Sequence, residues 1–328
     1  MLSDDPVLDR ITYVASPEPL APIPWPKGLA PKLPAKAPQE LPRGDVLVVT
    51  WTAAEARALA DVLTPGHASS AWQRYSDEWT RYEHQLTGRS PAKFSKCLGL
   101  WALTEIGGKR VVLFKSDLHL ATDALSMPIR QLWAQLVKAV KPKLAITTGT
   151  AGGIGEGTQL GDVCVTNGAK FNCQETFKAE PFAQQTFKGR PWKAGGQLKA
   201  SGRLLAANAG KLRPVANRNP EVATVIGKAG VETVDFFGFA DATDSYGIVG
   251  NDPYARTEEM DDATLPLALA DIKSATPWLS IRNASDPQVP HMLSLKAEKA
   301  WAERIYEEYG YWTTIGSAIA CWAVIADL

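Results

Sequence analysis

Short apolar runs that alternate with segments of helical composition constrain the fold of this chain more than any other feature. Asp45-Val-Leu-Val-Val-Thr50 is the first such run, and residues 53–63 follow it with helical composition. Runs of this kind are typical of strands that are buried on both faces of a parallel sheet. Strands that alternate with helices predict an α/β fold, here a three-layer αβα sandwich with a mixed central sheet.

The same alternation continues to the end of the chain. Gly107-Gly108 separates two strand-like runs and suggests a hairpin. Pro266 stands in the first turn of a helical segment, where proline is tolerated. Strands are expected at 98–106, 110–116, 144–148, 162–166, 222–226, 230–234 and 278–282, and helices at 121–140, 264–273, 294–309 and 313–326.

Two segments depart from the alternation. Residues 1–44 hold ten of the 23 prolines, and proline fixes φ and removes a backbone donor. We therefore expect a proline-rich extended arm with polyproline II character, wrapped on its own domain or loose rather than docked to a partner. Residues 172–221 are basic, polar and rich in Gly and Pro, so they predict an irregular excursion with one helix at 201–211. The folded domain is expected to span 45–328.

Charge and cysteine content exclude several classes of function. Lys plus Arg equals Asp plus Glu, at 35 each, so the chain has no basic surface for nucleic acid or an acidic membrane. The four cysteines show neither CxxC pairs nor metal-ligand spacing, so we expect reduced thiols and no metal. The N-terminus lacks a signal-peptide pattern, and the apolar stretch 315–328 is too short to span a bilayer. These features predict a cytoplasmic protein whose partner is a small molecule or another protein.

A glycine-rich stretch, Thr147-Thr-Gly-Thr-Ala-Gly-Gly-Ile-Gly-Glu-Gly157, directly follows a predicted buried strand. Glycines let the backbone approach a ligand closely. The pattern is neither a dinucleotide-binding GxGxxG turn nor a phosphate loop with its lysine. We therefore expect a loop that holds a ligand other than a pyrophosphate, although a merely tight turn is the alternative.

Two acidic clusters accompany this stretch. Glu258-Glu-Met-Asp-Asp262 precedes a helix, and Ile281-Arg-Asn-Ala-Ser-Asp286 ends the last predicted strand. Acids at strand ends are placed to meet a ligand in a shared crevice. Taken singly, an acid in such a position is more often a helix cap or a solvated side chain.

The order of these motifs resembles the purine nucleoside phosphorylase and nucleosidase superfamily, and is most similar to methylthioadenosine/adenosylhomocysteine nucleosidase. That family has a TGSAGG-like loop, a GDVV strand, an EME triplet and a strand that ends in R-x-x-S-D. Here the motifs are Thr148–Gly153, Gly161–Val163, Glu259–Asp261 and Arg282–Asp286. The resemblance covers roughly 45–66 and 110–326, less the excursion.

The resemblance implies cleavage of an N-glycosidic bond through an oxocarbenium-like sugar. Asp286 matches the acid that protonates the purine N7, and Ser285 would orient it. A carboxyl that donates a proton near neutral pH needs a raised pKa, which burial supplies. Glu55 matches the glutamate that activates water, and a first-turn helix acid stabilised by the helix dipole is the alternative for it.

The resemblance also implies a set of binding residues. Asp261 stands where the family uses glutamate to hold the sugar hydroxyls, and aspartate is one methylene shorter. Phe237 would stack on the base. The expected substrate-binding residues are Thr150, Ala151, Gly152, Phe237, Glu259, Met260, Asp261 and Arg282. Lys115–His119 replaces a glycine-rich turn of the family. His119 is expected at the surface, and a place in the site is the alternative for it.

Hydrolysis of a purine nucleoside or nucleotide is the favoured function. Phosphorylases bind phosphate with arginines, but Thr147 stands where some of them have one, and Glu55 would repel phosphate. Phosphorolysis, with phosphate as co-substrate, remains the alternative. A catalytically silent nucleoside-sensing or partner-regulated module is another. No other cofactor is implied, and the resemblance predicts a homo-oligomer, either a dimer or a hexamer.

Overall fold

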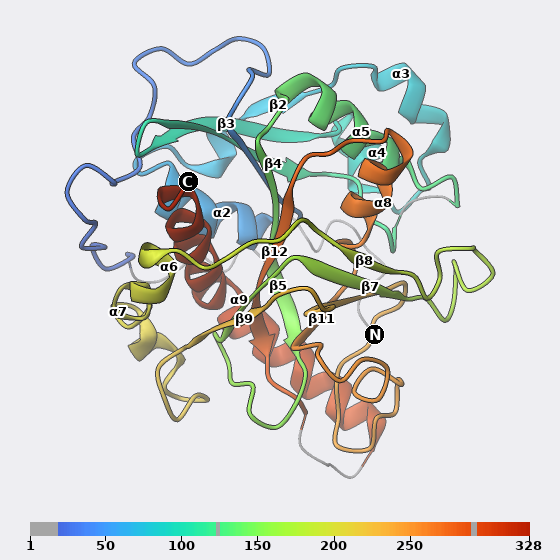
Figure 1. The fold of residues 1–328 in the computed structure, drawn as a ribbon. Coiled ribbons are helices and arrows are strands. Elements are labelled where there is room, and N and C mark those ends of the chain that lie inside the picture. Colours follow the sequence, from blue (N-terminus) through green and yellow to red (C-terminus); the bar gives the residue numbers. More distant parts are fainter. Residues whose placement is uncertain (1–18, 123–124, 290–293) are drawn as a thin grey trace.

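The structure is a computed structural model that describes residues 19–122, 125–289 and 294–328 (Figure 1). Its strands join in a mixed sheet with the order β2-β3-β4-β1-β5-β11-β10-β7-β8, while β12 pairs with β5 and β6, and β6 pairs with β9. The strands are β1 (Val46–Thr50), β2 (Gln73–Tyr75), β3 (Gly99–Ile106), β4 (Lys109–Ser116), β5 (Leu144–Gly153), β6 (Val163–Thr166), β7 (Gly168–Asn172), β8 (Thr186–Lys188), β9 (Val222–Val225), β10 (Val231–Val234), β11 (Thr257–Glu259) and β12 (Trp278–Asp286).

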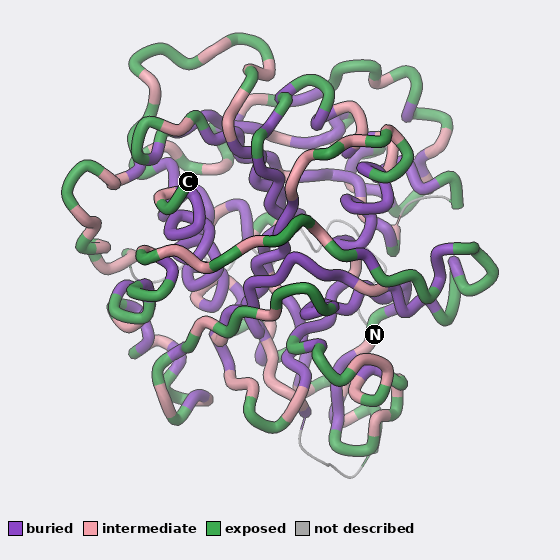
Figure 2. The backbone as a smooth tube through the Cα atoms, viewed as in Figure 1, coloured by how far each residue is buried: buried purple, intermediate pink, exposed green. Residues whose placement is uncertain are grey.

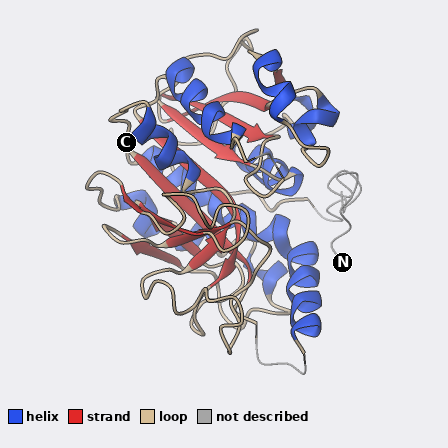
Figure 3. Ribbon diagram, turned by 90° about the vertical axis from the view of Figure 1, so that its right-hand side faces the viewer, coloured by secondary structure: helices blue, strands red, loops and turns tan. Residues whose placement is uncertain are grey.

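Helices lie on both faces of this sheet (Figure 3). They are α2 (Ala53–Leu63), α3 (Trp79–Tyr82), α4 (Pro91–Ser95), α5 (Pro128–Val140), α6 (Gly196–Ala200), α7 (Gly202–Leu205), α8 (Thr264–Asp271) and α9 (Leu295–Ala326), with 3₁₀ turns η1 (Ser69–Ala71), η2 (Glu83–Gln85) and η3 (Ala209–Leu212).

Alternating side chains of β1 show why the sheet is covered on both faces. Val46 and Val48 pack in a core cluster with buried residues of α2 and α9. Leu47 and Val49 point the other way, into a cluster with α5 and α8. Because successive strand residues face opposite sides, a fully apolar strand requires a helical layer on each face. The three-layer sandwich predicted from the sequence is confirmed.

Strand β5 is the centre of the sheet, and both β5 and β12 are buried along most of their length (Figure 2). Its first half pairs with β1, its whole length pairs in parallel with β12, and Gly152 and Gly153 pair antiparallel with β11. The expected end of this strand at residue 148 is wrong, because the strand continues through the glycine run to Gly153. Gly149, Gly152 and Gly153 thus lie in a strand between two neighbours, whereas Gly155 and Gly157 lie in the bend and turn after it.

Two helix predictions need correction. The segment predicted as a helix from 121 is helical only from Pro128, which occupies the first turn; residues 123–124 lie outside the described residues. The two helices expected at 294–309 and 313–326 are a single helix, α9. The helix continues past Gly310 because Thr313 and Ser317 bond to the side chain of Asn283 on β12. Within the described residues, no helix is long and apolar enough to cross a membrane.

The described part of the proline-rich arm, from residue 19, lies against the domain. The ring of Trp25 is 4.6 Å from that of Trp322 on α9, and Trp322 Nε1 donates a 2.6 Å hydrogen bond to Leu29 O. Residues 1–18 lie outside the described residues. The excursion at 172–221 holds the short elements β8, α6, α7 and η3, and residues 201–211 form two short turns rather than one helix.

We predict that Gly149→Ala destabilises the fold by about 1–3 kcal/mol. Gly149 has φ +144, where side chains are disfavoured, and a Cβ there would collide with the carboxyl of Glu55. Urea unfolding measures the change. Gly202→Ala is the matched control, because a Cβ there meets no atom within 4 Å, and it should change stability by less than about 0.5 kcal/mol. Equal effects of the two substitutions would contradict the close approach of Glu55.

Candidate active site

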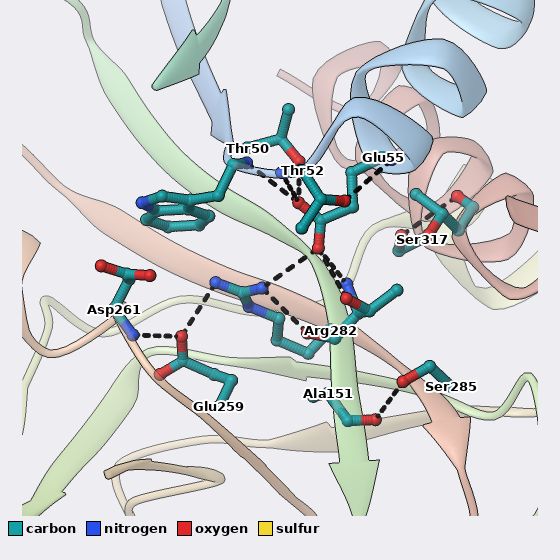
Figure 4. A network of polar contacts seen from close by, with 12 residues as sticks. Thr50, Thr52, Glu55, Ala151, Glu259, Asp261, Arg282, Ser285 and Ser317 are labelled. Carbon is teal, nitrogen blue, oxygen red and sulfur yellow. Dashed lines mark hydrogen bonds and ion pairs between the residues drawn. The ribbon is translucent and has the colours of Figure 1, made fainter. Parts of the chain in front are cut away.

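Glu55 is held at the start of α2 against the glycine run of β5. Thr52 caps the helix and forms a capping box with Glu55. The Glu55 side chain is buried and reaches from the helix to the strand (Figure 4). Its Oε2 accepts hydrogen bonds from Thr50 Oγ1 at 2.8 Å and from Trp51 N and Thr52 N at 2.9 Å, and its Oε1 accepts from Thr150 N and Thr150 Oγ1 at 2.7 Å.

These contacts keep the Glu55 carboxyl ionised. Burial alone would raise its pKa, but the nearby Arg282 guanidinium and the hydrogen bonds outweigh burial and lower the pKa below its ordinary value. Both carboxylate oxygens already accept hydrogen bonds. Glu55 is therefore a fixed negative charge at the Gly149–Thr150 end of the glycine run.

Arg282 on β12 is the cationic centre of the site. Its Nε lies 3.1 and 3.0 Å from the two carboxylate oxygens of Asp262, and its Nη2 lies 2.5 Å from Asp262 Oδ1 and 3.0 Å from Glu259 Oε2. Its Nη1 donates to Thr150 O at 3.0 Å. Burial would lower the pKa of this guanidinium, but Asp262 and Glu259 raise it. Arg282 is thus charged and occupied by partners within the protein.

Glu259 is also satisfied internally. Its Oε1 accepts from Thr233 Oγ1 at 2.6 Å, and its Oε2 accepts from Asp261 N at 2.6 Å and from Arg282. Asp262 N lies within 3.0 Å of both oxygens. Burial first, and then neighbouring Asp262, raise the pKa of Glu259 to about 8. Glu259 therefore anchors the turn that leads into α8.

Asp261 points toward the loop after β4. Its Oδ1 accepts from Leu120 N at 2.8 Å, and its Oδ2 lies 3.0 Å from His119 Nε2. The expectation that His119 lies at the surface is wrong, because its side chain is only 26% exposed and pairs with this buried acid. The loop that replaces the family's glycine-rich turn thus supplies an imidazole to the carboxyl expected to hold the sugar.

Asp286, at the end of β12, lies against the other end of the glycine run. A Cβ at Gly152 would be 3.3 Å from Asp286 Oδ2. Ser285 Oγ is 2.9 Å from Asp286 Oδ1 and 3.2 Å from Ala151 O. Burial raises the pKa of Asp286 to about 7, against the opposing hydrogen bond from Ser285. This carboxyl can therefore hold a proton near neutral pH and give it up.

The two apolar residues expected at the site, Phe237 and Met260, differ in their surroundings. Phe237 is 37% exposed, and Lys299 Nζ lies 5.0 Å from its ring centroid. Met260 packs on a small cluster that contains Val234 and Phe236. An exposed aromatic beside the end of a sheet is free to cover a ligand, and this placement is compatible with the predicted stacking role of Phe237.

Two functional candidates were not assigned a role from the sequence. Trp51 is buried, its ring centroid lies 4.6 Å from the guanidinium carbon of Arg282, and its indole N–H is without a partner in the described residues. Glu258 is buried beside Gly152. The sequence feature that could have indicated a role for Trp51 is its position between the first apolar run and the helix that follows it. The signal for Glu258 was its position in the acidic cluster, but the register that sets it opposite Gly152 is a tertiary property.

A metal site is not formed by the described residues, since no group of three or more His, Cys, Asp or Glu side chains among them is arranged to hold an ion. All four cysteines are buried and free. Burial raises the pKa of Cys164, Cys173 and Cys321 to about 12, so these thiols are poor nucleophiles.

Solved structures of a nucleosidase and of a hydrolase share the fold of this chain. The 5′-methylthioadenosine/S-adenosylhomocysteine nucleosidase of Neisseria meningitidis, solved with methylthio-immucillin-A, matches 86% of this chain and 99% of its own, with a TM-score of 0.52 and 17% identity. Futalosine hydrolase of Helicobacter pylori matches 86% of this chain and 97% of its own, with a TM-score of 0.51 and 9% identity.

A curated relative supports the same resemblance over a shorter stretch. The 5′-methylthioadenosine/S-adenosylhomocysteine nucleosidase of Listeria innocua is 41% identical over 63 residues, which is 19% of this chain and 24% of that protein. The match thus spans about a quarter of that relative's length. No family model matches the chain. The resemblance predicted from the motif order is confirmed.

We predict that Asp262→Ala destabilises the protein by about 3–5 kcal/mol, because it leaves the buried Arg282 without its main partner. Asp271→Ala is the matched control. It removes an ion pair with Arg130 in which the side chains are 40% and 33% exposed, and such pairs contribute about 0–1 kcal/mol. Chemical unfolding of both variants is the measurement. A cost for Asp262→Ala no larger than that of the control would contradict the central role given to this ion pair.

Proposed function

We propose that this chain hydrolyses the N-glycosidic bond of a purine nucleoside. The observation that carries the proposal is the pair of buried carboxyls on one glycine run. Ionised Glu55 stands at Gly149–Thr150, and Asp286, with a pKa of about 7, stands at Gly152. Two carboxyls whose environments move their pKa values apart are suited to separate acid and base roles. Likeness to nucleosidases of known structure supports the assignment.

Each carboxyl has a defined task in this proposal. Protonated Asp286 gives its proton to N7 of the purine while the bond between C1′ and N9 breaks, so the base leaves uncharged. Glu55 accepts a proton from the water that attacks C1′ of the oxocarbenium-like sugar, and the oxygen of that water becomes the new hydroxyl. Ser285 holds Asp286 in place. Thr150, Ala151 and Gly152 form the floor under the nucleoside.

Water is favoured over phosphate as the nucleophile. A phosphate site needs cationic donors that are free to bind it, whereas Arg282 is occupied by Asp262, Glu259 and Thr150. Glu55 adds a negative charge where the nucleophile would stand. A solved structure of the same fold that is named a hydrolase also supports water as the nucleophile. The homo-oligomer, whether dimer or hexamer, is proposed on the resemblance alone.

A second candidate is a nucleoside-binding module without turnover. The observation that favours it is the internal satisfaction of Glu55, Glu259, Asp261 and Arg282, each of which already bonds to partners within the chain. Sugar hydroxyls would have to compete with these contacts. Tight nucleoside binding without release of base, unchanged in Asp286→Asn, would establish this second function.

We predict release of free base and reducing sugar in phosphate-free buffer from at least one nucleoside of a panel. The panel comprises adenosine, inosine, 5′-methylthioadenosine, S-adenosylhomocysteine and futalosine, because relatives are named for the last three. Asp286→Asn should lower kcat/KM about 10²–10⁴-fold, the usual contribution of a general acid. Asp77→Asn changes an exposed acid and should leave activity unchanged. Release that requires phosphate and yields a sugar phosphate would contradict hydrolysis.

The pH dependence of kcat/KM should report the acid. Because the pKa of Asp286 is about 7, the acid is protonated below that pH and is lost above it. We therefore expect kcat/KM to be level below pH 7 and to fall about tenfold per pH unit well above it. At low pH, protonation of Glu55 should also reduce kcat/KM. Because the pKa of Glu55 is lowered, this loss should begin below the pH at which an ordinary glutamate is protonated. A profile that rises through pH 7 would show that Asp286 is not the proton donor.

A further inference from the structure

Glu258 is a second carboxyl at the base-binding end of the site. It lies on β11, directly opposite Gly152 of β5, and Asp286 lies opposite the same glycine on the other side. A Cβ at Gly152 would overlap Glu258 Oε1 and would lie 3.3 Å from Asp286 Oδ2. The two carboxyls therefore meet over one glycine, from two different strands.

The Glu258 carboxyl has no partner of its own. The residue is 4% exposed, and within the described part of the chain no hydrogen bond or ion pair satisfies its carboxyl oxygens. Buried polar groups are almost always hydrogen-bonded, and an unpaired one costs free energy. By contrast, hydrogen bonds from within the chain satisfy other buried carboxyls of the site, those of Glu55, Glu259 and Asp261. Glu258 is thus a buried acid of this site whose carboxyl has bonding capacity left for a ligand.

Its surroundings keep Glu258 uncharged. Burial first, and then Asp286, Glu259 and Glu232, raise its pKa well above the ordinary value. Glu232 stands next to it on β10. A neutral carboxyl offers one donor and one acceptor, so Glu258 can bond either to a carbonyl or to an amino group.

We infer that Glu258 reads the substituent at C6 of the purine and makes the site specific for purines with a hydrogen-bonding group there. The inference rests on the proposed function, in which Asp286 meets N7. The C6 substituent is the polar group next to N7 on the same edge of the base, and Glu258 is the free polar group next to Asp286. Adenine and hypoxanthine both present such a group, whereas unsubstituted purine does not.

The test compares nucleosides that differ only at C6. We expect wild type to prefer adenosine or inosine over purine riboside. Glu258→Leu should reduce that ratio of kcat/KM values at least tenfold, because a site built to bond a polar group discriminates strongly against its absence. Glu258→Gln keeps a donor and an acceptor, so it should retain the ratio within about threefold. Glu180→Leu, at an exposed acid in the excursion, is the control and should change nothing.

The outcomes separate this inference from the proposed function. If Glu258→Leu lowers kcat/KM equally for all three nucleosides, or leaves the ratio unchanged, the inference is overturned while hydrolysis stands. If wild type releases no base, calorimetric binding of adenine, hypoxanthine and unsubstituted purine to wild type and Glu258→Leu tests the contact without turnover. Loss of the preference for the substituted bases would then support it, and an unchanged preference would overturn it. Thermal unfolding checks that the leucine variant, which loses an unpaired buried acid, is folded.

Discussion

The close approach of carboxyl groups to the glycine run of β5 is the constraint on which the site depends. Gly149 admits the side chain of Glu55, and Gly152 admits those of Glu258 and Asp286. Any side chain at these positions would occupy the space of a carboxyl. Because β5 is paired on both sides, its backbone cannot move away. The same glycines that leave the strand without side chains therefore create room for these acids.

Several buried acids lie along this glycine run, but the positive charge that offsets them lies near only one of its ends. At the Glu55 end, Arg282 holds Asp262 and Glu259 in contact and keeps Glu55 ionised. At the Asp286 end no cation among the described residues is in contact with the carboxyl, and burial raises the pKa of Asp286 to about 7. Contact with one arginine thus separates Glu55, whose pKa is lowered, from Asp286, whose pKa is raised. The two carboxyls of the proposed acid–base mechanism therefore differ in protonation because of their surroundings.

Much of the fold was predictable because its signals are local. Apolar runs gave β1, β4 and β12, and the glycine pair gave the β3–β4 hairpin. The errors have tertiary causes. Strand β5 extends through glycines because β11 and β12 supply pairing partners. Helix α9 continues through Gly310 because Thr313 and Ser317 form hydrogen bonds with the side chain of Asn283. Similarly, Asp286 and Glu55 follow from motif order, whereas His119 at Asp261 and Glu258 at Gly152 depend on strand register and loop path.

The most direct test is a crystal structure of the chain with methylthio-immucillin-A, the ligand of the Neisseria meningitidis nucleosidase structure. Our account places the base of this compound over Gly152, with its nitrogen at the N7 position within hydrogen-bonding distance of Asp286. The sugar-like ring should lie toward Glu55. A complex in which the base lies beside Glu55 and the sugar-like ring lies beside Asp286 would contradict these assignments. So would a complex in which the base does not contact Asp286.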